Sequence, residues 1–208
     1  MTKPVAIGAV CALVLIVILA GLNPWRASPQ IVRSTVTDDA FGIIAARNFA
    51  EQARNDSIVL IAYGDEDDAT EAAIRRRNAF LKEAQSQKLR IIAVVSPLAA
   101  YKEKMSKDAL LTLPVREQGI DASSIRLALT HRPQVIVSLE GVPIDLVQNN
   151  LGRTRFFAAD PYMINDTAPL VNQGLVQALL CYREDADWSK SLKDPEEIAS
   201  ARFRYLTR

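Results

Sequence analysis

Short apolar runs alternate with amphipathic stretches along most of this 208-residue chain. Five runs have the length of strands that are buried on both faces, and they cover residues 57–63, 90–96, 134–139, 155–159 and 175–181. The segments between them place apolar residues at helical spacing. This alternation predicts an α/β domain with a doubly wound, mostly parallel sheet of about five to six strands.

Helices are predicted before and between these runs. Asp38 or Asp39 can cap the first helix, whose apolar stripe comprises Phe41, Ala45, Phe49 and Ala53. Asp68 and Glu71 resemble a capping box that opens a second helix, with inward positions at Ile74, Phe80, Leu81 and Ala84. The three consecutive arginines at 75–77 point around this helix, so we expect two of them to be solvated. Further helices are predicted over residues 121–132 and 143–151.

The end of the chain has a strong helix start. Asp194 can act as the cap, Pro195 stands in the first turn, and Glu197 lies three residues after the cap. This helix is expected to run toward Tyr205, so residues 189–208 are predicted to form a helical tail. A short isolated helix is marginal in water, and its apolar residues therefore pack against something. We expect a partner protein there, with the domain itself and the anionic membrane surface as alternatives.

The first 26 residues predict a transmembrane anchor. Residues 4–25 form an uncharged run of 22 residues, which as a helix covers about 30 Å, the thickness of the hydrocarbon core. Trp25 and Arg26 suit the membrane interface. The alternative is a cleaved signal peptide, although its apolar region is usually shorter and no clear cleavage site follows here. Residues 27–36 form a linker, and a short amino terminus before a long polar domain favours an extracytoplasmic domain at the inner membrane.

Charge and composition argue against several classes of function. With 25 basic and 24 acidic residues, the chain has no strong field that favours nucleic acid. It has no glycine-rich phosphate loop and no nucleophile elbow. The only histidine, His131, suits a helix carboxyl terminus, and Cys11 and Cys181 lie far apart, so neither a metal site nor a disulfide is expected. The acidic run at 65–68 lacks the spacing of a calcium loop. We therefore expect a protein that is not an enzyme and holds no cofactor.

Six short motifs follow one another between residues 37 and 188. They are DDAFG at 38–42, the strand and glycine at 58–64, RRNAF at 76–80, RPQVIV at 132–137, FAAD at 157–160 and NQGLVQA at 172–178. In this order they resemble the second lobe of the type I periplasmic binding proteins, the fold of ribose-binding protein and of the core of lac-repressor-like regulators. The resemblance covers about 150 residues, and residues 37–188 are accordingly expected to form one such lobe.

The resemblance implies a set of ligand-binding positions. Arg76 and Asp160 fall where the family's arginine and aspartate hold sugar hydroxyls, and Asp39 in the helix-opening motif is a third candidate. Charge-assisted donors and acceptors of this kind suit a polyol, so the possible ligand is a small polar solute. The chain departs from the family at Glu140, where an asparagine is usual, and at Cys181, where a glutamine is often found. Each lost hydrogen-bonding group weakens a polar site by about 1–3 kcal/mol.

The family binds its ligand between two lobes, and neither residues 27–36 nor the residues after 188 are expected to form the first one. A lobe without its partner leaves a face that needs another cover. Our leading hypothesis is therefore a non-enzymatic accessory or scaffold subunit, anchored in the bilayer, that contacts other protein subunits of a membrane complex. The alternative is a solute-binding or sensing module that is completed by a lobe from another chain.

Overall fold

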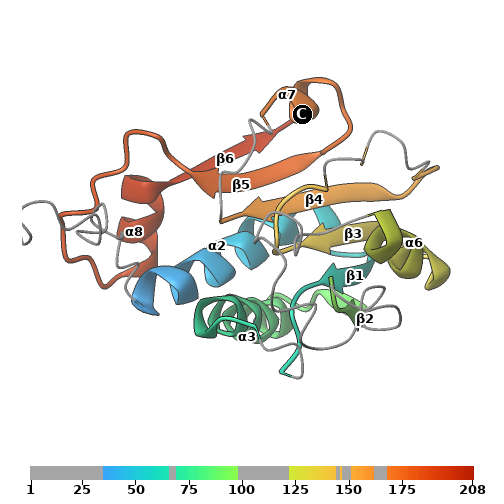
Figure 1. Cartoon of the computed structure of the whole chain (residues 1–208), viewed down its shortest axis with the longest axis horizontal. Helices are drawn as coiled ribbons and strands as arrows, with labels where there is room; N and C mark the ends of the chain where they lie inside the picture. Colours follow the sequence, from blue (N-terminus) through green and yellow to red (C-terminus); the bar gives the residue numbers. More distant parts are fainter. Residues whose placement is uncertain (1–34, 66–68, 98–121, 144–145, 147–150, 162–167) are drawn as a thin grey trace, which may run out of the picture. The chain divides into compact units, whose positions relative to one another are not determined.

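One six-stranded sheet organises the chain (Figure 1). The computed structural model describes residues 35–65, 69–97, 122–143, 146, 151–161 and 168–208. The strand order is β2-β1-β3-β4-β5-β6, in which the first five strands are parallel and β6 is antiparallel to β5. The strands are β1 (Ser57–Ile61), β2 (Arg90–Val95), β3 (Val135–Ser138), β4 (Arg155–Asp160), β5 (Ala178–Tyr182) and β6 (Phe203–Thr207). The expected doubly wound, mostly parallel sheet is confirmed.

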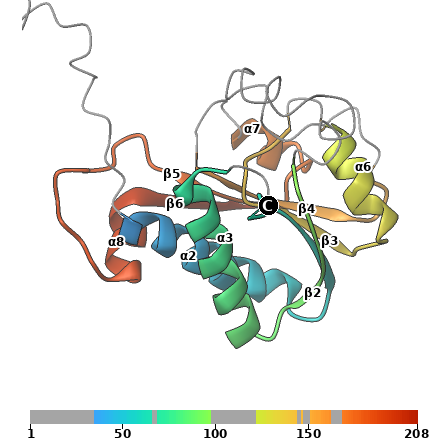
Figure 2. The same cartoon turned by 60° about the horizontal axis from the view of Figure 1, so that its bottom comes forward.

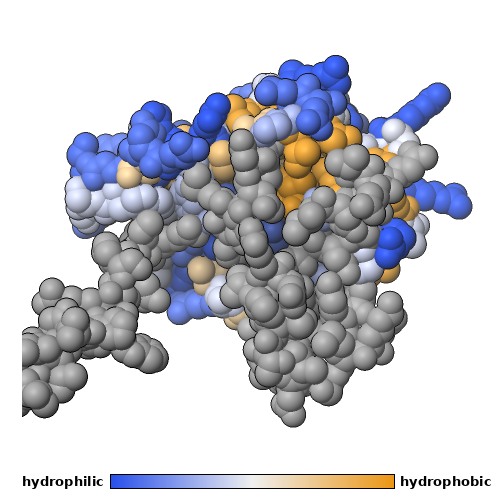
Figure 3. Space-filling model, turned by 45° about the horizontal axis from the view of Figure 1, so that its top comes forward, coloured by the Kyte–Doolittle hydropathy of each residue, from blue (hydrophilic) through white to orange (hydrophobic). Residues whose placement is uncertain are grey.

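Helices cover both faces of the sheet. They are α2 (Thr35–Ala53), α3 (Glu71–Ser86), α6 (Ala122–Thr130), α7 (Ala168–Asn172) and α8 (Pro195–Arg202). Alternate residues of each central strand face opposite sides, so Leu60 joins a core with α2, α3 and α8 while Ile61 joins a second core with α6 and α7. Figure 2 shows α2 and α3 side by side against one face. In the view of Figure 3, hydrophobic residues gather on the side that carries the second core.

A glycine lets α2 and α3 cross closely. A Cβ at Gly42 would lie 2.2 Å from the backbone oxygen of Arg76 and 2.9 Å from the backbone nitrogen of Phe80. No other residue type fits this crossing without moving a helix. The glycine in the DDAFG motif therefore fixes how α3, and with it Arg76, lies beside the start of α2.

Two local expectations are corrected. Residues 90–96 are expected to form a fully buried strand, but β2 is the outermost of the described strands, and its Ile92 and Val94 are 40% and 46% exposed. Its apolar sequence does not reveal its outer position, because that position depends on the strand order. The cap of α3 is Thr70, whose Oγ1 accepts a hydrogen bond from the Ala73 backbone at 3.3 Å, while Asp68 lies outside the described residues.

The carboxyl-terminal segment also differs from expectation. The helix that starts at Asp194 ends at Arg202, and β6 follows it and pairs with β5. Phe203 is buried and Tyr205 packs against the same core, whereas Leu206 packs against the opposite one. This alternation is typical of a strand. The segment is therefore part of the lobe, which corrects both the helical tail and the expected partner contact through its aromatic residues.

Other expectations fall on residues that the structure does not describe. They are the proposed anchor, residues 1–26, most of the linker expected over 27–36, and most of the helix expected over 143–151. Residues 35 and 36, the end of the expected linker, belong to α2 instead. Among the described residues, no helix has the length and apolar character needed to cross a membrane.

Candidate functional site

The candidate site lies at the carboxyl edge, the side of the sheet where the parallel strands end. In doubly wound sheets, ligands bind at this edge, where neighbouring crossovers turn to opposite faces. Here that point lies between β1 and β3, because α3 leaves β1 on one face and α6 precedes β3 on the other. The first turn of α2 reaches the same edge, since this helix runs antiparallel to β1 (Figure 1).

Four charged side chains gather there, and we call them the carboxyl-edge cluster: Asp38, Arg76, Glu140 and Asp160. Arg76 Nη1 donates to Asp38 Oδ1 at 3.3 Å, and its Nη2 lies 3.6 Å from Glu140 Oε2. Arg76 is only 1% exposed, and the three carboxylate residues are also buried. The arginine therefore lies between two carboxylates that neutralise it.

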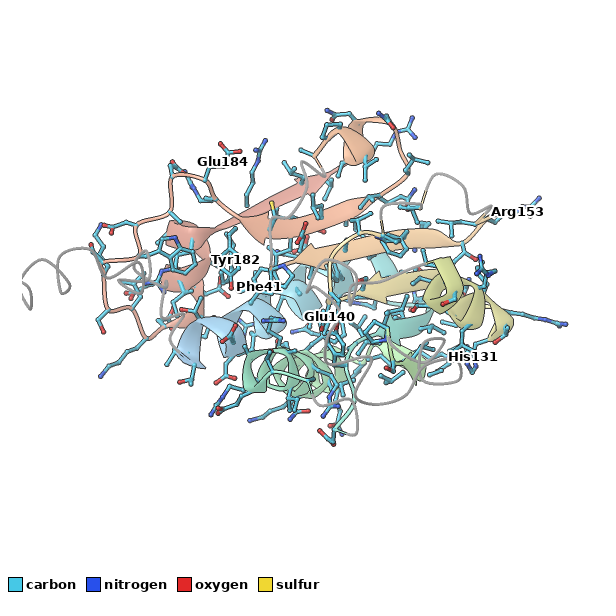
Figure 4. All side chains as sticks on the ribbon, viewed as in Figure 1. Phe41, His131, Glu140, Arg153, Tyr182 and Glu184 are labelled. Carbon is cyan, nitrogen blue, oxygen red and sulfur yellow. The ribbon has the colours of Figure 1, made fainter. Side chains whose placement is uncertain are left out.

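A tight turn after β3 positions Glu140. Ser138 Oγ donates to the Gly141 carbonyl at 2.7 Å and accepts from the Glu140 backbone N–H at 3.1 Å. Gly141 has a φ of +87°, which favours glycine, and its N–H donates to the Ala159 carbonyl at 3.0 Å. A Cβ on Gly141 would lie 3.3 Å from Asp160 Oδ1, so the chain passes directly over that carboxylate. The turn thus brings Glu140 to Arg76 and covers Asp160 (Figure 4 labels Glu140).

The electrostatics of the cluster favour a structural role. Buried charges are tolerated when they are paired, and Arg76 supplies the positive charge for Asp38 and Glu140. No group of three potential metal ligands occurs among the described residues. The cluster offers charge-assisted hydrogen bonds through one guanidinium and its neighbouring carboxylates.

The three candidates from the sequence lie in two places. Arg76 and Asp160 both reach the carboxyl edge, where the Glu140–Gly141 turn contacts each of them. Asp39 does not join them. Its side chain is 45% exposed and lies 3.9 Å from Arg75, in a groove between α2 and α3.

Two members of the cluster were not among those candidates. Asp38 carries a detectable signal, because it stands three residues before Phe41 and seven before Ala45 and so shares the buried face of α2. Glu140 follows a strand end, but its pairing with Arg76 depends on the strand order. The expectation that two of the three arginines of α3 are solvated is wrong. Only Arg75 is substantially exposed, since Arg77 donates to the Tyr63 carbonyl at 2.9 Å and to Asp65 at 2.6 Å.

A second buried arginine, Arg202, also contacts the first turn of α2. Arg202 Nη1 donates to Thr37 Oγ1 at 2.6 Å and Nη2 to the Lys190 carbonyl at 2.6 Å, while the guanidinium lies 5.0 Å from the centre of the Trp188 ring. Tyr182 packs between that tryptophan and Phe41, with ring centres 5.1 Å apart in both pairs (Figure 4). The start of α2 is thus fixed by contacts on both sides, and it presents Asp38 to Arg76 in one orientation.

Comparison with known proteins identifies the fold. No family model and no curated protein matches the chain. Among solved structures, the chain is similar to an ABC transporter solute-binding protein from Burkholderia graminis in complex with D-arabinose, with 13% identity and a TM-score of 0.52. It is also similar to GanP, a glucose-galactose binding protein from Geobacillus stearothermophilus, with 12% identity and a TM-score of 0.52. In each case the likeness covers 82% of this chain and 60% of the other.

These likenesses show that the chain has the fold of the type I periplasmic binding proteins, as the motif resemblance implied. The chain thus spans less than two thirds of the length of these two proteins. The structural neighbours are solute-binding proteins by description. The sugars named for these two proteins are their own ligands, and at 13% and 12% identity the likeness shows only that the fold is shared.

Proposed function

We propose that this chain is a membrane-anchored, non-enzymatic lobe that acts as an accessory subunit through contacts with other proteins. In this proposal residues 1–26 anchor it in the inner membrane, and the lobe lies on the extracytoplasmic side. The solute-binding fold then supplies a rigid scaffold rather than a ligand cleft.

The observation that carries the proposal is that the candidate ligand-binding side chains of the carboxyl-edge cluster already contact other parts of the chain. Arg76, which would hold a polar ligand, is neutralised by Asp38 and Glu140 instead. Asp160, the other candidate, lies under the turn at Gly141. A sugar hydroxyl would have to displace these internal contacts, and the buried charges would then lose partners that each contribute to stability.

A second candidate function is supported by the position of the cluster. Arg76 and Asp160 lie at the carboxyl edge beside the turn that follows β3, one of the two strands at the switch point where proteins of this architecture bind ligands. If another chain supplied a facing lobe, opening of the Glu140–Gly141 turn could expose both residues. The chain would then be a solute-binding or sensing module for a small polar solute.

Calorimetry separates the two functions. The full chain in detergent micelles is titrated with D-arabinose, D-glucose and D-galactose, alongside the variants Asp160→Asn and Asp39→Asn. The accessory-subunit proposal expects no saturable heat for any of these proteins. Saturable heat that Asp160→Asn abolishes and Asp39→Asn retains would overturn it in favour of solute binding, because only Asp160 belongs to the cluster.

The association and the anchor need their own measurements. The tagged chain, solubilised from native membranes, is expected to migrate with other subunits in a complex larger than itself, and migration as a lone monomer would contradict an accessory role. Amino-terminal sequencing of the same material is expected to begin at or near Met1. A mature start near Ala27 would show cleavage instead of an anchor.

A further inference from the structure

The large apolar side chains that remain exposed among the described residues lie on two neighbouring elements. Ile92 and Val94 of β2 are 40% and 46% exposed, and Leu127 of α6 is 39% exposed. β2 and α6 contact each other at the edge of the sheet. Single exposed apolar residues are ordinary, but these lie on both sides of one edge. Val94 pairs with Leu60 and so lies on the face of α3, whereas Leu127 lies on α6 on the opposite face, so a strand added to β2 would pass between them.

The backbone of β2 can accept another strand. Within the described part of the chain, β2 pairs with β1 alone, on one side. Proteins usually guard such an edge with prolines or several charges. Here Arg90 is the single charge in the strand, and the rest is Ile-Ile-Ala-Val-Val, which has high strand propensity. A β-bulge at Ile92 interrupts the register with β1, but the strand continues to Val95.

The charged residues of β2, of the residue pair before it and of α6 are all positive. Lys88 and Arg90 lie at the start of β2, and Arg126 precedes Leu127 on α6. All three are exposed, and none forms an ion pair with a described residue, although the chain as a whole carries a net charge of only +1. Unpaired cations beside exposed apolar residues select a partner that brings carboxylates.

We infer that this β2–α6 surface, comprising Lys88, Arg90, Ile92, Val94, Arg126 and Leu127, binds an extended acidic segment of another protein that adds as a strand to β2. The partner's backbone pairs with the edge of β2 that no described strand occupies, its apolar side chains cover Ile92 and Val94, and its carboxylates meet the cations. A second copy of the chain fits poorly. Pairing β2 with β2 would bring no carboxylate, because Arg90 is the single charged residue of the strand, so the cations of both copies would stay without partners.

The inference rests on the proposed function, because it assigns the surface through which an accessory subunit would dock. It lies apart from the carboxyl-edge cluster, since Lys88 and Arg90 stand where β2 begins. It also does not need the aromatic residues of the carboxyl-terminal segment, which are packed in the lobe.

A peptide in which glutamate and valine alternate tests the recognition directly. The fluorescent peptide is titrated into the full chain in detergent micelles and followed by anisotropy, beside a peptide in which lysine replaces every glutamate. We expect saturable binding of the acidic peptide alone. The double variant Arg90→Glu/Arg126→Glu should weaken it at least about tenfold. The matched control Arg153→Glu/Arg208→Glu, which reverses exposed cations beside β4 and β6, should change the affinity less than about twofold.

Equal binding of both peptides would overturn the inference, because the charge of the partner would then play no part in recognition. Equal loss in the two variants would also overturn it, because that result shows nonspecific charge attraction. Self-association of the chain that Ile92→Lys/Val94→Lys abolishes would also overturn it, in favour of a second copy. Uptake by vesicles of anionic lipid that needs the same cations would point to a membrane surface instead.

Migration of the native complex separates this inference from the proposed function. If the wild-type chain migrates alone, the proposed function fails. If it migrates in a complex that Ile92→Lys/Val94→Lys leaves intact, the proposed function stands and the docking surface is wrong. The expected result is a complex that this variant loses while circular dichroism shows an unchanged fold.

Discussion

Replacing Arg76 with methionine tests whether the carboxyl-edge cluster stabilises the lobe. The substitution keeps a long side chain but removes the cation between Asp38 and Glu140, whose side chains are 5% and 1% exposed. Breaking a buried ion pair from one side costs about 3–5 kcal/mol, because the remaining charges are left in a medium of low dielectric constant. That loss is a large part of an ordinary folding stability of about 5–15 kcal/mol.

The assay is urea unfolding of the full chain in detergent micelles, followed by tryptophan fluorescence, to which Trp188 contributes from its contact with Tyr182. A loss of this size lowers the unfolding midpoint by about 2 M urea for a domain of this size. A loss below about 1 kcal/mol would refute the reasoning, since an unpaired buried charge cannot be so well tolerated.

Two variants isolate the charge effect. Arg75→Met removes a neighbouring arginine whose pair with Glu71 lies on the surface, and it should change stability by less than about 0.5 kcal/mol. The triple variant Asp38→Asn/Arg76→Met/Glu140→Gln removes all three charges together and should recover most of the loss. If the triple variant is no more stable than Arg76→Met, packing rather than charge explains the effect.

Three further predictions address other parts of the lobe. Gly42→Ala should lower the free energy of unfolding by about 1–3 kcal/mol in the same urea assay, because its Cβ would lie 2.2 Å from the backbone oxygen of Arg76 in α3. An unchanged unfolding midpoint would contradict the close crossing of α2 and α3. Deleting residues 195–208 should unfold the lobe, as seen by circular dichroism. The deletion removes the buried side chains of Ile198 and Phe203, which contribute about 1.5–3 kcal/mol each, and it takes β6 away from β5. A truncated protein that stays folded would show that the segment is dispensable. Burial raises the pKa of Tyr205 to about 12 from 10.0, so its contribution to stability is complete below pH 10 and disappears as the pH rises toward 12. Tyr205→Phe should lack this loss, and identical pH profiles of the two proteins would disprove it.

Much of the fold could be predicted from local patterns. The apolar runs at 57–63, 134–139 and 155–159 are strands at the centre of the sheet, where burial on both faces requires a continuous apolar sequence. The helix with Phe41 and Phe49 on its stripe is also found as expected, because helical spacing places these residues on one face. The alternation of these elements was enough to predict the parallel sheet and the type of lobe.

Predictions failed where the outcome depends on neighbours in space. The sequence of β2 is as apolar as that of β3, yet two of its residues are exposed because β2 is outermost. Residues 203–207 follow a well-capped helix, and they become a strand because β5 offers a free antiparallel edge. Neither fact can be obtained from the local sequence, since both depend on which elements pack together.

The candidate site shows the same division between sequence and structure. The sequence by itself determined that Arg76 follows one strand and Asp160 ends another, and the architecture then places both at the carboxyl edge. It also determined the apolar run at residues 4–25, from which an anchor is expected. Helical spacing puts Asp38 rather than Asp39 on the buried face of α2, but only the tertiary structure decided that Arg76 meets it there and that the turn after β3 brings Glu140 to the same guanidinium. The reason is physical. A helix or a strand follows from the periodicity of its own residues, whereas a buried ion pair requires that segments far apart in the sequence leave water together.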